Sequence, residues 1–133
     1  EARLIAGGSR PKNNSKGWFI EPTVFTDVSN NAVIAREEIF GPVLSIIPFD
    51  GEDEAISLAN DSDFGLGGSV WSADNDHALS VANKVNSGTV GINGYAPSIG
   101  APFGGVKSSG LGREIGPEAI DNYQVLKSTY IMS

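Results

Sequence analysis

The stretch Glu37-Glu38-Ile39-Phe40-Gly41-Pro42-Val43 runs directly into the apolar segment 43–49, and we expect it to decide how the chain folds. Two carboxylates, a ring and a Gly-Pro pair before an apolar run predict a charged turn at the end of a buried strand. Ligands of open α/β sheets bind at strand ends. A carboxylate accepts hydrogen bonds from a sugar diol and a phenyl ring lies against a planar heterocycle, so the turn suits a nucleotide. The same residues also fit a purely structural turn, which is the commoner case.

Composition limits the classes of function that remain. The 133 residues carry a net charge of -7, which makes nucleic acid and anionic membranes poor partners. No apolar stretch reaches the length of a membrane span and no signal-peptide pattern opens the chain, so we predict one domain in the cytoplasm. The absence of cysteine excludes disulfides, thiolate zinc sites and a cysteine nucleophile from these residues. Because the sequence opens at Glu1 without a methionine, we expect a processed chain or a piece of a larger one.

The remaining pattern alternates strands and helices, which predicts an α/β fold with a sheet that is parallel at its centre and has right-handed crossovers. The strands expected are 3–6 in a hairpin with 18–25, then 43–49 covered on both faces, 69–72, 89–93 and 125–131. The helices expected are 32–35 capped from 27–31, 52–59 capped by Asp50, 75–85 capped by Asp74, and 117–122. The loop between residues 95 and 116 is long for a compact domain and is therefore expected to have a function.

The glycine-rich segment 102–114 invites comparison with a phosphate-binding loop. A P-loop needs glycine immediately before lysine, whereas Val106 stands before Lys107. The glycine spacing also fails the dinucleotide fingerprint, and no strand directly precedes it. The segment is therefore interpreted as a set of tight turns in which small residues permit close packing, with Lys107 and Arg113 forming salt bridges.

Two further features suggest chemistry but have simpler explanations. The acidic residues in 50–54 lack the spacing and the downstream glutamate of a calcium loop, and acids are common at helix starts. His77 is the only histidine and has no second ligand candidate nearby, so it is expected to be solvated. We therefore predict neither a metal site nor a catalytic residue among these side chains.

A set of motifs, in this order, resembles the aldehyde dehydrogenase superfamily over almost the whole chain. The motifs are Phe19-Ile20-Glu21-Pro22-Thr23-Val24-Phe25, Glu37-Glu38-Ile39-Phe40-Gly41-Pro42-Val43, Phe64-Gly65-Leu66, Gly88-Thr89-Val90-Gly91-Ile92-Asn93, Pro102-Phe103-Gly104-Gly105-Val106-Lys107-Ser108-Ser109-Gly110 and Gly112-Arg113-Glu114. The resemblance implies a three-layer α/β fold with a mainly parallel sheet. Residues 1–123 would be the C-terminal part of the catalytic domain, and residues 124–133 would be an oligomerisation strand.

The resemblance also implies an activity and roles for individual residues. The family oxidises aldehydes to carboxylic acids with NAD or NADP through a cysteine thioester. Glu38 matches the glutamate that accepts hydrogen bonds from the nicotinamide ribose, and Phe40 matches the aromatic beside the nicotinamide. Leu66 resembles a residue lining the same end of the cofactor. Phe103 matches an aromatic of the aldehyde channel, and Ile99 lies in a segment, 95–101, that resembles the family's variable substrate loop.

The departures from the family pattern limit what these residues do alone. The cysteine nucleophile, the glutamate base, the oxyanion-hole asparagine and the nucleotide-binding domain lie upstream in the family and are absent here. We therefore expect the 133 residues to be inactive by themselves and not to bind NAD or NADP tightly. Family members often carry a glutamate where Val125 stands, so the ion pair that Arg113 would make with it is not expected.

The leading hypothesis is thus part of an aldehyde dehydrogenase whose partners are an aldehyde, the upstream part of its own chain, and further copies in a homodimer or homotetramer. An alternative from another class is a non-enzymatic assembly module whose strand 125–131 pairs with the edge of a partner sheet. A third hypothesis is an independent nucleotide-binding domain. Measurable NAD or NADP binding by the isolated chain would favour this third hypothesis.

Overall fold

The computed structural model describes residues 2–132, which divide into two compact units. The first unit ends at Asp61 and the second begins at Ser62. Each unit has its own β-structure, with one sheet in the first and two in the second. Helices and strands occur in both units, as the predicted α/β class requires.

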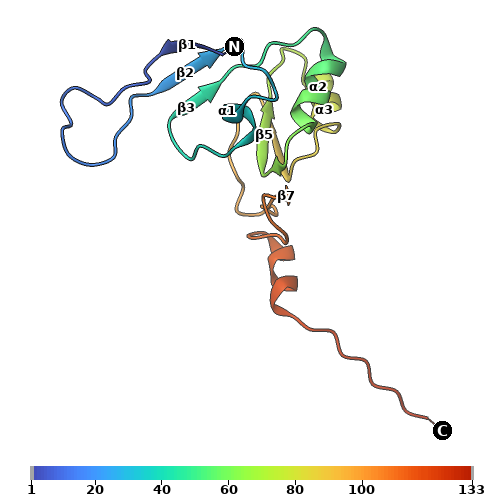
Figure 1. The fold of residues 1–133 in the computed structure, drawn as a ribbon. Coiled ribbons are helices and arrows are strands. Elements are labelled where there is room, and N and C mark those ends of the chain that lie inside the picture. The colour runs from blue at the N-terminus through green and yellow to red at the C-terminus, as the bar shows by residue number, and fades with distance from the viewer. Residues whose placement is uncertain (1, 133) are drawn as a thin grey trace. The chain divides into compact units, whose positions relative to one another are not determined.

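The first unit is built on a three-stranded sheet in the order β1 (Arg3–Ala6), β2 (Thr23–Thr26) and β3 (Val43–Ser45) (Figure 1). β1 pairs with β2 in antiparallel fashion, with a bulge between Leu4 and Ala6, and β2 pairs with β3 in parallel. The predicted hairpin is therefore confirmed for its 23–25 part. Residues 18–20 lie in the connecting loop instead, where Trp18 is 99% exposed.

The helices of the first unit begin without the predicted side-chain caps. Ala32 precedes α1 (Val33–Arg36) and has no side-chain oxygen that could cap the helix. Gly51, with φ at 88°, precedes α2 (Glu52–Asn60) and likewise has no side chain. Asp50 lies one residue too early to cap α2, and its backbone N–H instead donates to the Glu54 carboxylate. The expected capping by 27–31 and by Asp50 is therefore wrong, although the acids of the first turn of α2 do favour the helix dipole.

The apolar run after the turn forms a much shorter strand than the sequence predicts. β3 ends at Ser45 and its partner β2 ends at Thr26, where Asp27 has φ at 55°. Beyond these ends the N–H of Val28 still donates to the carbonyl of Ile46 at 3.1 Å, but the regular ladder does not continue. Pro48 has no N–H with which to continue a ladder. Leu44 and Phe49 are 58% and 61% exposed, so residues 2–132 do not cover both faces of this segment as predicted.

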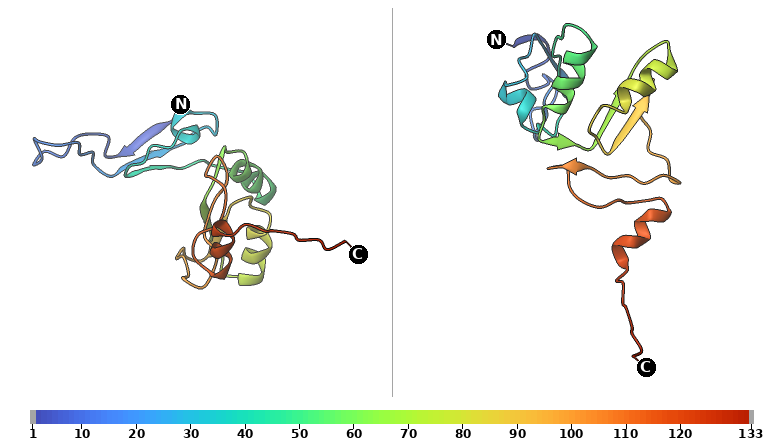
Figure 2. Two further views of the ribbon diagram at one scale, coloured as in Figure 1. Left: turned by 90° about the horizontal axis from the view of Figure 1, so that it is seen from below. Right: turned by 90° about the vertical axis from the view of Figure 1, so that its right-hand side faces the viewer.

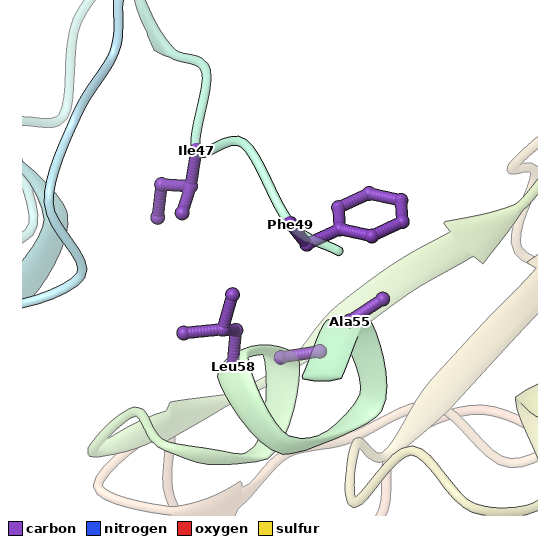
Figure 3. Close-up of a pocket in the computed structure, with 5 residues that line it drawn as sticks. Ile47, Phe49, Ala55 and Leu58 are labelled. Atoms are coloured by element: carbon purple, nitrogen blue, oxygen red, sulfur yellow. The ribbon is translucent and has the colours of Figure 1, made fainter. Parts of the chain in front are cut away.

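An apolar hollow lies between the end of this run and α2. It has a volume of about 230 Å³ and is lined by Ile47, Phe49, Ala55, Leu58 and Ala59. Figure 3 shows Ile47 and Phe49 on the extended segment facing the α2 side chains across the hollow. Every lining residue is apolar, which makes the hollow a packing surface without a polar group to orient a ligand.

The second unit contains two small sheets. β4 (Phe64–Gly65) pairs with β7 (Val106–Lys107) in antiparallel fashion. β5 (Gly67–Val70) pairs with β6 (Thr89–Ile92) in parallel over four residue pairs, and α3 (Asn75–Ala82) connects them and packs on both (Figure 2). The predicted parallel pairing of successive strands is therefore confirmed here.

Helix α3 begins as the sequence predicts. One carboxylate oxygen of Asp74 accepts hydrogen bonds from the backbone N–H groups of Asp76 and His77, at 3.0 and 3.1 Å. Ala78 and Ala82 on the inner face of α3 are buried. An N-cap and a stripe of small apolar residues together fix where this helix starts and which side faces the sheet.

The chain continues through η1 (Pro117–Tyr123), a 3₁₀ helix at the position of the predicted last helix, into an extended tail. Residues 124–132 form no strand, and Val125 and Ile131 are each 95% exposed. Figures 1 and 2 show this red tail leaving η1 as an extended segment. The predicted strand 125–131 is unpaired because strand pairing needs a partner edge, and no strand among the described residues supplies one.

Buried hydrophobic side chains are few. Val28, Ala78 and Ala82 are the only ones among residues 2–132. In the same part of the chain, no helix is both long enough and apolar enough to cross a bilayer.

Candidate functional site

The turn 37–42 is held at both ends by backbone hydrogen bonds. At its start, the N–H of Glu37 donates to the carbonyl of Val33 at 2.9 Å and closes α1. At its end, the N–H of Thr23 in β2 donates to the carbonyl of Pro42 at 2.9 Å. The turn thus connects the end of a helix to a sheet, as the sequence predicts for a loop before a strand.

Phe40 projects from the tip of this turn. Its backbone has φ at 53°, the left-handed region that non-glycine residues seldom adopt, and its side chain is 92% exposed. Such a conformation costs about 1–2 kcal/mol for a residue with a Cβ and persists only where the surrounding structure holds it. Residues with strained backbone cluster at ligand-contacting and catalytic sites, which makes Phe40 a candidate contact residue.

Glu38 is exposed and offers its carboxylate from the same turn. Within residues 2–132 its carboxylate has no hydrogen-bond or ion-pair partner. A carboxylate provides acceptors only, and hydroxyl groups of a ligand can satisfy them. The turn therefore presents the unpaired acceptor and the accessible ring that its sequence predicts.

Arg36 connects the start of this turn to the end of α2. Its guanidinium donates to the carbonyl and to the carboxylate of Asp61, each at 2.6 Å, and to the Asn31 side-chain carbonyl at 2.9 Å. The amide of Asn30 donates to the same carboxylate at 2.8 Å. Sequence reasoning missed this cluster because its members lie up to 31 positions apart, and no local pattern signals such a pairing.

The other predicted site residues lie in the second unit. Leu66 joins β4 to β5 and is 44% exposed, and Ile99 is 88% exposed in the loop before β7. Phe103 is half-buried, and its backbone N–H and carbonyl pair with those of Glu114 at 2.8 and 2.6 Å. The carbonyl of Ile99 accepts from the N–H of Gly116 at 3.2 Å. The bridge between Phe103 and Glu114 therefore joins the two ends of the glycine-rich segment, and Gly116, just after the segment, is bonded to the loop that carries Ile99.

The glycine-rich segment forms tight turns, as interpreted from its sequence. A Cβ on Gly105 would lie 2.8 Å from the carbonyl oxygen of Ser109, so a larger residue does not fit without a backbone shift. The side chain of Arg113 donates to the carbonyls of Gly105 and Gly112, at 2.8 and 2.7 Å. Among the described residues Arg113 forms no ion pair, so its predicted salt bridge is replaced by bonds to carbonyls that the turns leave unsatisfied.

Asn93 is a further residue that sequence reasoning did not single out. Its φ is 54°, and its side-chain amide exchanges hydrogen bonds with the backbone N–H and carbonyl of Ser72, at 2.8 and 2.9 Å. The side-chain amide thus makes the pair of hydrogen bonds that a backbone would make in a sheet. It joins the end of β6 to the chain after β5. An asparagine directly after a strand was the available signal, because asparagine tolerates this conformation better than most residues.

Gly67, directly after Leu66, lies in close contact with Tyr95 of segment 95–101. A Cβ on Gly67 would lie 2.3 Å from the hydroxyl oxygen of Tyr95 and 2.7 Å from its Cζ. Tyr95 therefore lies over a strand position where only glycine leaves room. A Cβ on the neighbouring Gly68 would meet no atom within 4 Å.

Residues 2–132 contain no group of three or more histidine, cysteine or acidic side chains arranged to hold a metal ion. His77 is exposed in the first turn of α3, as expected from its polar surroundings.

Comparison with known proteins identifies the family. Residues 1–129 match the model of the aldehyde dehydrogenase family. The chain is 63% identical over 132 residues to geranial dehydrogenase of Castellaniella defragrans, covering 99% of this chain and 27% of that protein. It is 50% identical over 133 residues to betaine aldehyde dehydrogenase of Rhizobium leguminosarum, covering 98% of this chain and 27% of that protein.

Solved structures show the same likeness in three dimensions. An aldehyde dehydrogenase of Mycobacterium tuberculosis complexed with NAD+ superposes with a TM-score of 0.89 at 54% identity, over 92% of this chain and 25% of that one. The indole-3-acetaldehyde dehydrogenase of P. syringae, in complex with NAD+ and IAA, gives a TM-score of 0.90 at 46% identity, over 98% and 26% of the two chains.

The chain thus spans about a quarter of the length of the relatives it matches. The likeness to these catalytic-domain structures confirms the predicted α/β fold class. Because a family model covers nearly all of its residues, the chain belongs to the aldehyde dehydrogenase family.

Proposed function

We propose that this chain forms part of an NAD(P)-dependent aldehyde dehydrogenase that oxidises an aldehyde to a carboxylic acid. The observation that carries the proposal is the turn 37–42, which presents an unpaired carboxylate at Glu38 and an exposed ring two residues later at Phe40. Family membership supports the reaction class. The cysteine nucleophile that the family reaction needs is not among these residues, so the chain supplies contacts and the rest of the enzyme supplies the chemistry.

The side chains of the turn fit a nicotinamide cofactor. Glu38 would accept hydrogen bonds from the nicotinamide ribose hydroxyls, and Phe40 would lie beside the nicotinamide ring, with Leu66 lining the same end of the cofactor. When bound, the cofactor supplies a hydride acceptor. The contribution of this chain is to orient that acceptor. With so few contacts of its own, the isolated chain would not bind NAD or NADP tightly.

The aldehyde would meet Phe103 and Ile99. Both side chains are apolar, and the backbone bonds of Phe103 to Glu114 and of Ile99 to Gly116 hold their loop segments in place. Apolar side chains on fixed backbone favour the hydrocarbon part of a substrate, since they provide contact area without a competing polar group. Segment 95–101 would accordingly influence which aldehyde is accepted.

The tail completes the proposal at the level of assembly. Residues 125–131 would add a strand to the sheet of another subunit in a homodimer or homotetramer, which would pair the backbone groups that the described residues leave without a strand partner. A cytoplasmic location belongs to the same proposal. No comparison favours the alternative of a non-enzymatic assembly module.

The test replaces Glu38 by glutamine in the full-length enzyme that contains this chain. Hydrogen bonds to a charged group contribute about 1.5–3 kcal/mol, so the Kd for the cofactor should rise by about tenfold or more. Glu37→Gln is the matched control, because it removes a neighbouring exposed carboxylate from the same turn. An equal Kd in the two variants would remove Glu38 from the cofactor site.

A further inference from the structure

We propose that Arg36 is a positioning residue for the proposed cofactor-binding turn 37–42. Its hydrogen bonds to Asp61, called the clasp below, hold the start of that turn in place. This inference rests on the proposed function, since it assumes that Glu38 and Phe40 contact the cofactor. Arg36 does not itself touch the cofactor in this proposal. It acts by fixing the helix end from which Glu38 projects two residues later.

The clasp is made of several bonds that converge on one residue. The guanidinium of Arg36 donates from Nη1 to the backbone carbonyl of Asp61 and from Nη2 to its carboxylate, each at 2.6 Å. Asn30 Nδ2 donates to the same two acceptors, at 3.2 and 2.8 Å, and Asn31 Oδ1 accepts from Arg36 at 2.9 Å. A planar guanidinium matches such a set of acceptors in a single orientation, which an ammonium group does not.

The clasp is important because α1 is not stable without contacts to the rest of the protein. The helix has four residues and no side-chain cap at its start, so it is far too short to be stable alone. Hydrogen bonds to residues outside the helix hold it. Ser45 Oγ donates to the carbonyl of Ile34 at 3.2 Å on the β3 side, and Arg36 reaches Asp61 at the end of α2. The last helical residue before the turn is therefore tied to the end of α2 through Asp61 and to the start of α1 through Asn31.

The other end of the turn is held independently of Arg36. The bond from Thr23 to Pro42 and the 2.8 Å bond from the N–H of Val43 to the carbonyl of Gly41 fix the entry into β3. Loss of the clasp would therefore free one end of the turn while the sheet stays paired. The order of the turn can therefore be measured separately from the stability of the protein, which makes the positioning role testable.

A second ion pair in the same unit provides a matched control. Arg3 Nε lies 3.1 Å from Asp27 Oδ2, and these side chains are 66% and 57% exposed. The Arg36 side chain is 31% exposed and donates to both Asp61 and Asn31, whereas the more exposed Arg3 donates to Asp27. Exposed pairs contribute little to stability, so Arg3→Ala measures the effect of losing an arginine without loss of a clasp.

The first measurement needs no catalysis. Hydrogen–deuterium exchange is recorded for residues 37–42 in the full-length enzyme without cofactor, comparing Arg36→Ala, Arg36→Lys and Arg3→Ala. We expect the amides of this turn to exchange faster in Arg36→Ala, to a smaller extent in Arg36→Lys, and as in the parent in Arg3→Ala. Unchanged exchange in Arg36→Ala would overturn the clasp, whatever the role of Glu38.

The second measurement is the Kd for reduced cofactor, obtained by fluorescence titration of the same variants, of Glu38→Gln and of the double variant. Arg36→Ala should raise the Kd about threefold to tenfold, and its effect should shrink in the Glu38→Gln background because both changes act on one contact. If Glu38→Gln raises the Kd and Arg36→Ala does not, the inference fails and the proposed function stands. If Glu38→Gln has no effect, the proposed function fails, and the inference that rests on it fails too.

The variant Asp61→Asn distinguishes a displaced turn from a protein that fails to fold. Asp61→Asn keeps the backbone carbonyl that accepts from Arg36 and removes only the charge. We expect it to raise the Kd less than Arg36→Ala, with the melting temperature unchanged. If every variant of the clasp lowers the melting temperature and weakens cofactor and aldehyde binding alike, the clasp is merely structural and the proposal is wrong.

Discussion

Replacing Gly67 by alanine should displace the ring of Tyr95 and the loop that follows it. The added Cβ would lie 2.3 Å from the Tyr95 hydroxyl oxygen, 2.7 Å from Cζ and 3.0 Å from Cε2. Because β5 is paired with β6 at this position, the strand is less free to move than the side chain. We therefore expect the ring to swing toward solvent.

The size of the effect follows from how much of the ring is covered. Tyr95 is 45% exposed, so roughly half of its surface would be released. At about 25 cal/mol per Å² and about 200 Å² for a fully buried aromatic side chain, this release costs up to about 2.5 kcal/mol. If the loop needs that contact to hold Ile99, its preferred conformation changes.

The assay is the kcat/KM for a series of aldehydes of increasing length in the full-length enzyme, with the cofactor Kd measured beside it. We expect kcat/KM to fall by about tenfold for at least part of the series while the cofactor Kd stays the same. Gly68→Ala is the control, because a Cβ there meets nothing within 4 Å. In a Tyr95→Ala background, Gly67→Ala should have no further effect. Equal aldehyde profiles for Gly67→Ala and Gly68→Ala would refute the reasoning.

Two other outcomes follow from the structure. Asp74→Ala removes the acceptor for the N–H groups of Asp76 and His77 and should lower the free energy of unfolding by about 1 kcal/mol, measured by chemical denaturation with Asp76→Ala as the control. An unchanged midpoint would show that the cap is not needed. Deletion of residues 124–133 from the full-length enzyme should lower its mass in solution, measured by light scattering, because the tail is proposed to pair only between subunits. An oligomer of unchanged mass would contradict that proposal.

The sequence predicted those parts of the fold whose signals are local. The Asp74 cap and the βαβ unit around α3 depend on such signals and are present, and the hairpin of β1 with β2 is present for the 23–25 part of its prediction. The strand 43–49 was predicted too long because its end depends on where its partner β2 ends, which lies elsewhere in the sequence. The tail 125–131 was predicted as a strand from its alternation, which indicates a preference for pairing without supplying a partner.

The same distinction applies to the candidate site. Glu38 and Phe40 were identifiable because the turn that exposes them is contiguous in sequence. The Arg36–Asp61 clasp joins residues 25 positions apart, and the contact of Tyr95 with Gly67 depends on a missing side chain. Neither leaves a periodic or compositional trace, because each arises from how separate elements meet. The roles of Glu38, Phe40, Leu66, Ile99 and Phe103 remain predictions.

The apolar surface left open by the described residues has an evolutionary consequence. Leu44, Phe49 and Ile131 are more than half exposed, whereas Val28, Ala78 and Ala82 are the only hydrophobic side chains buried among residues 2–132. In a full-length enzyme we expect side chains of this kind to pack against residues outside this segment. Their tolerance to substitution would then be decided elsewhere in the polypeptide, and we expect them to covary across homologues with positions that this sequence does not contain.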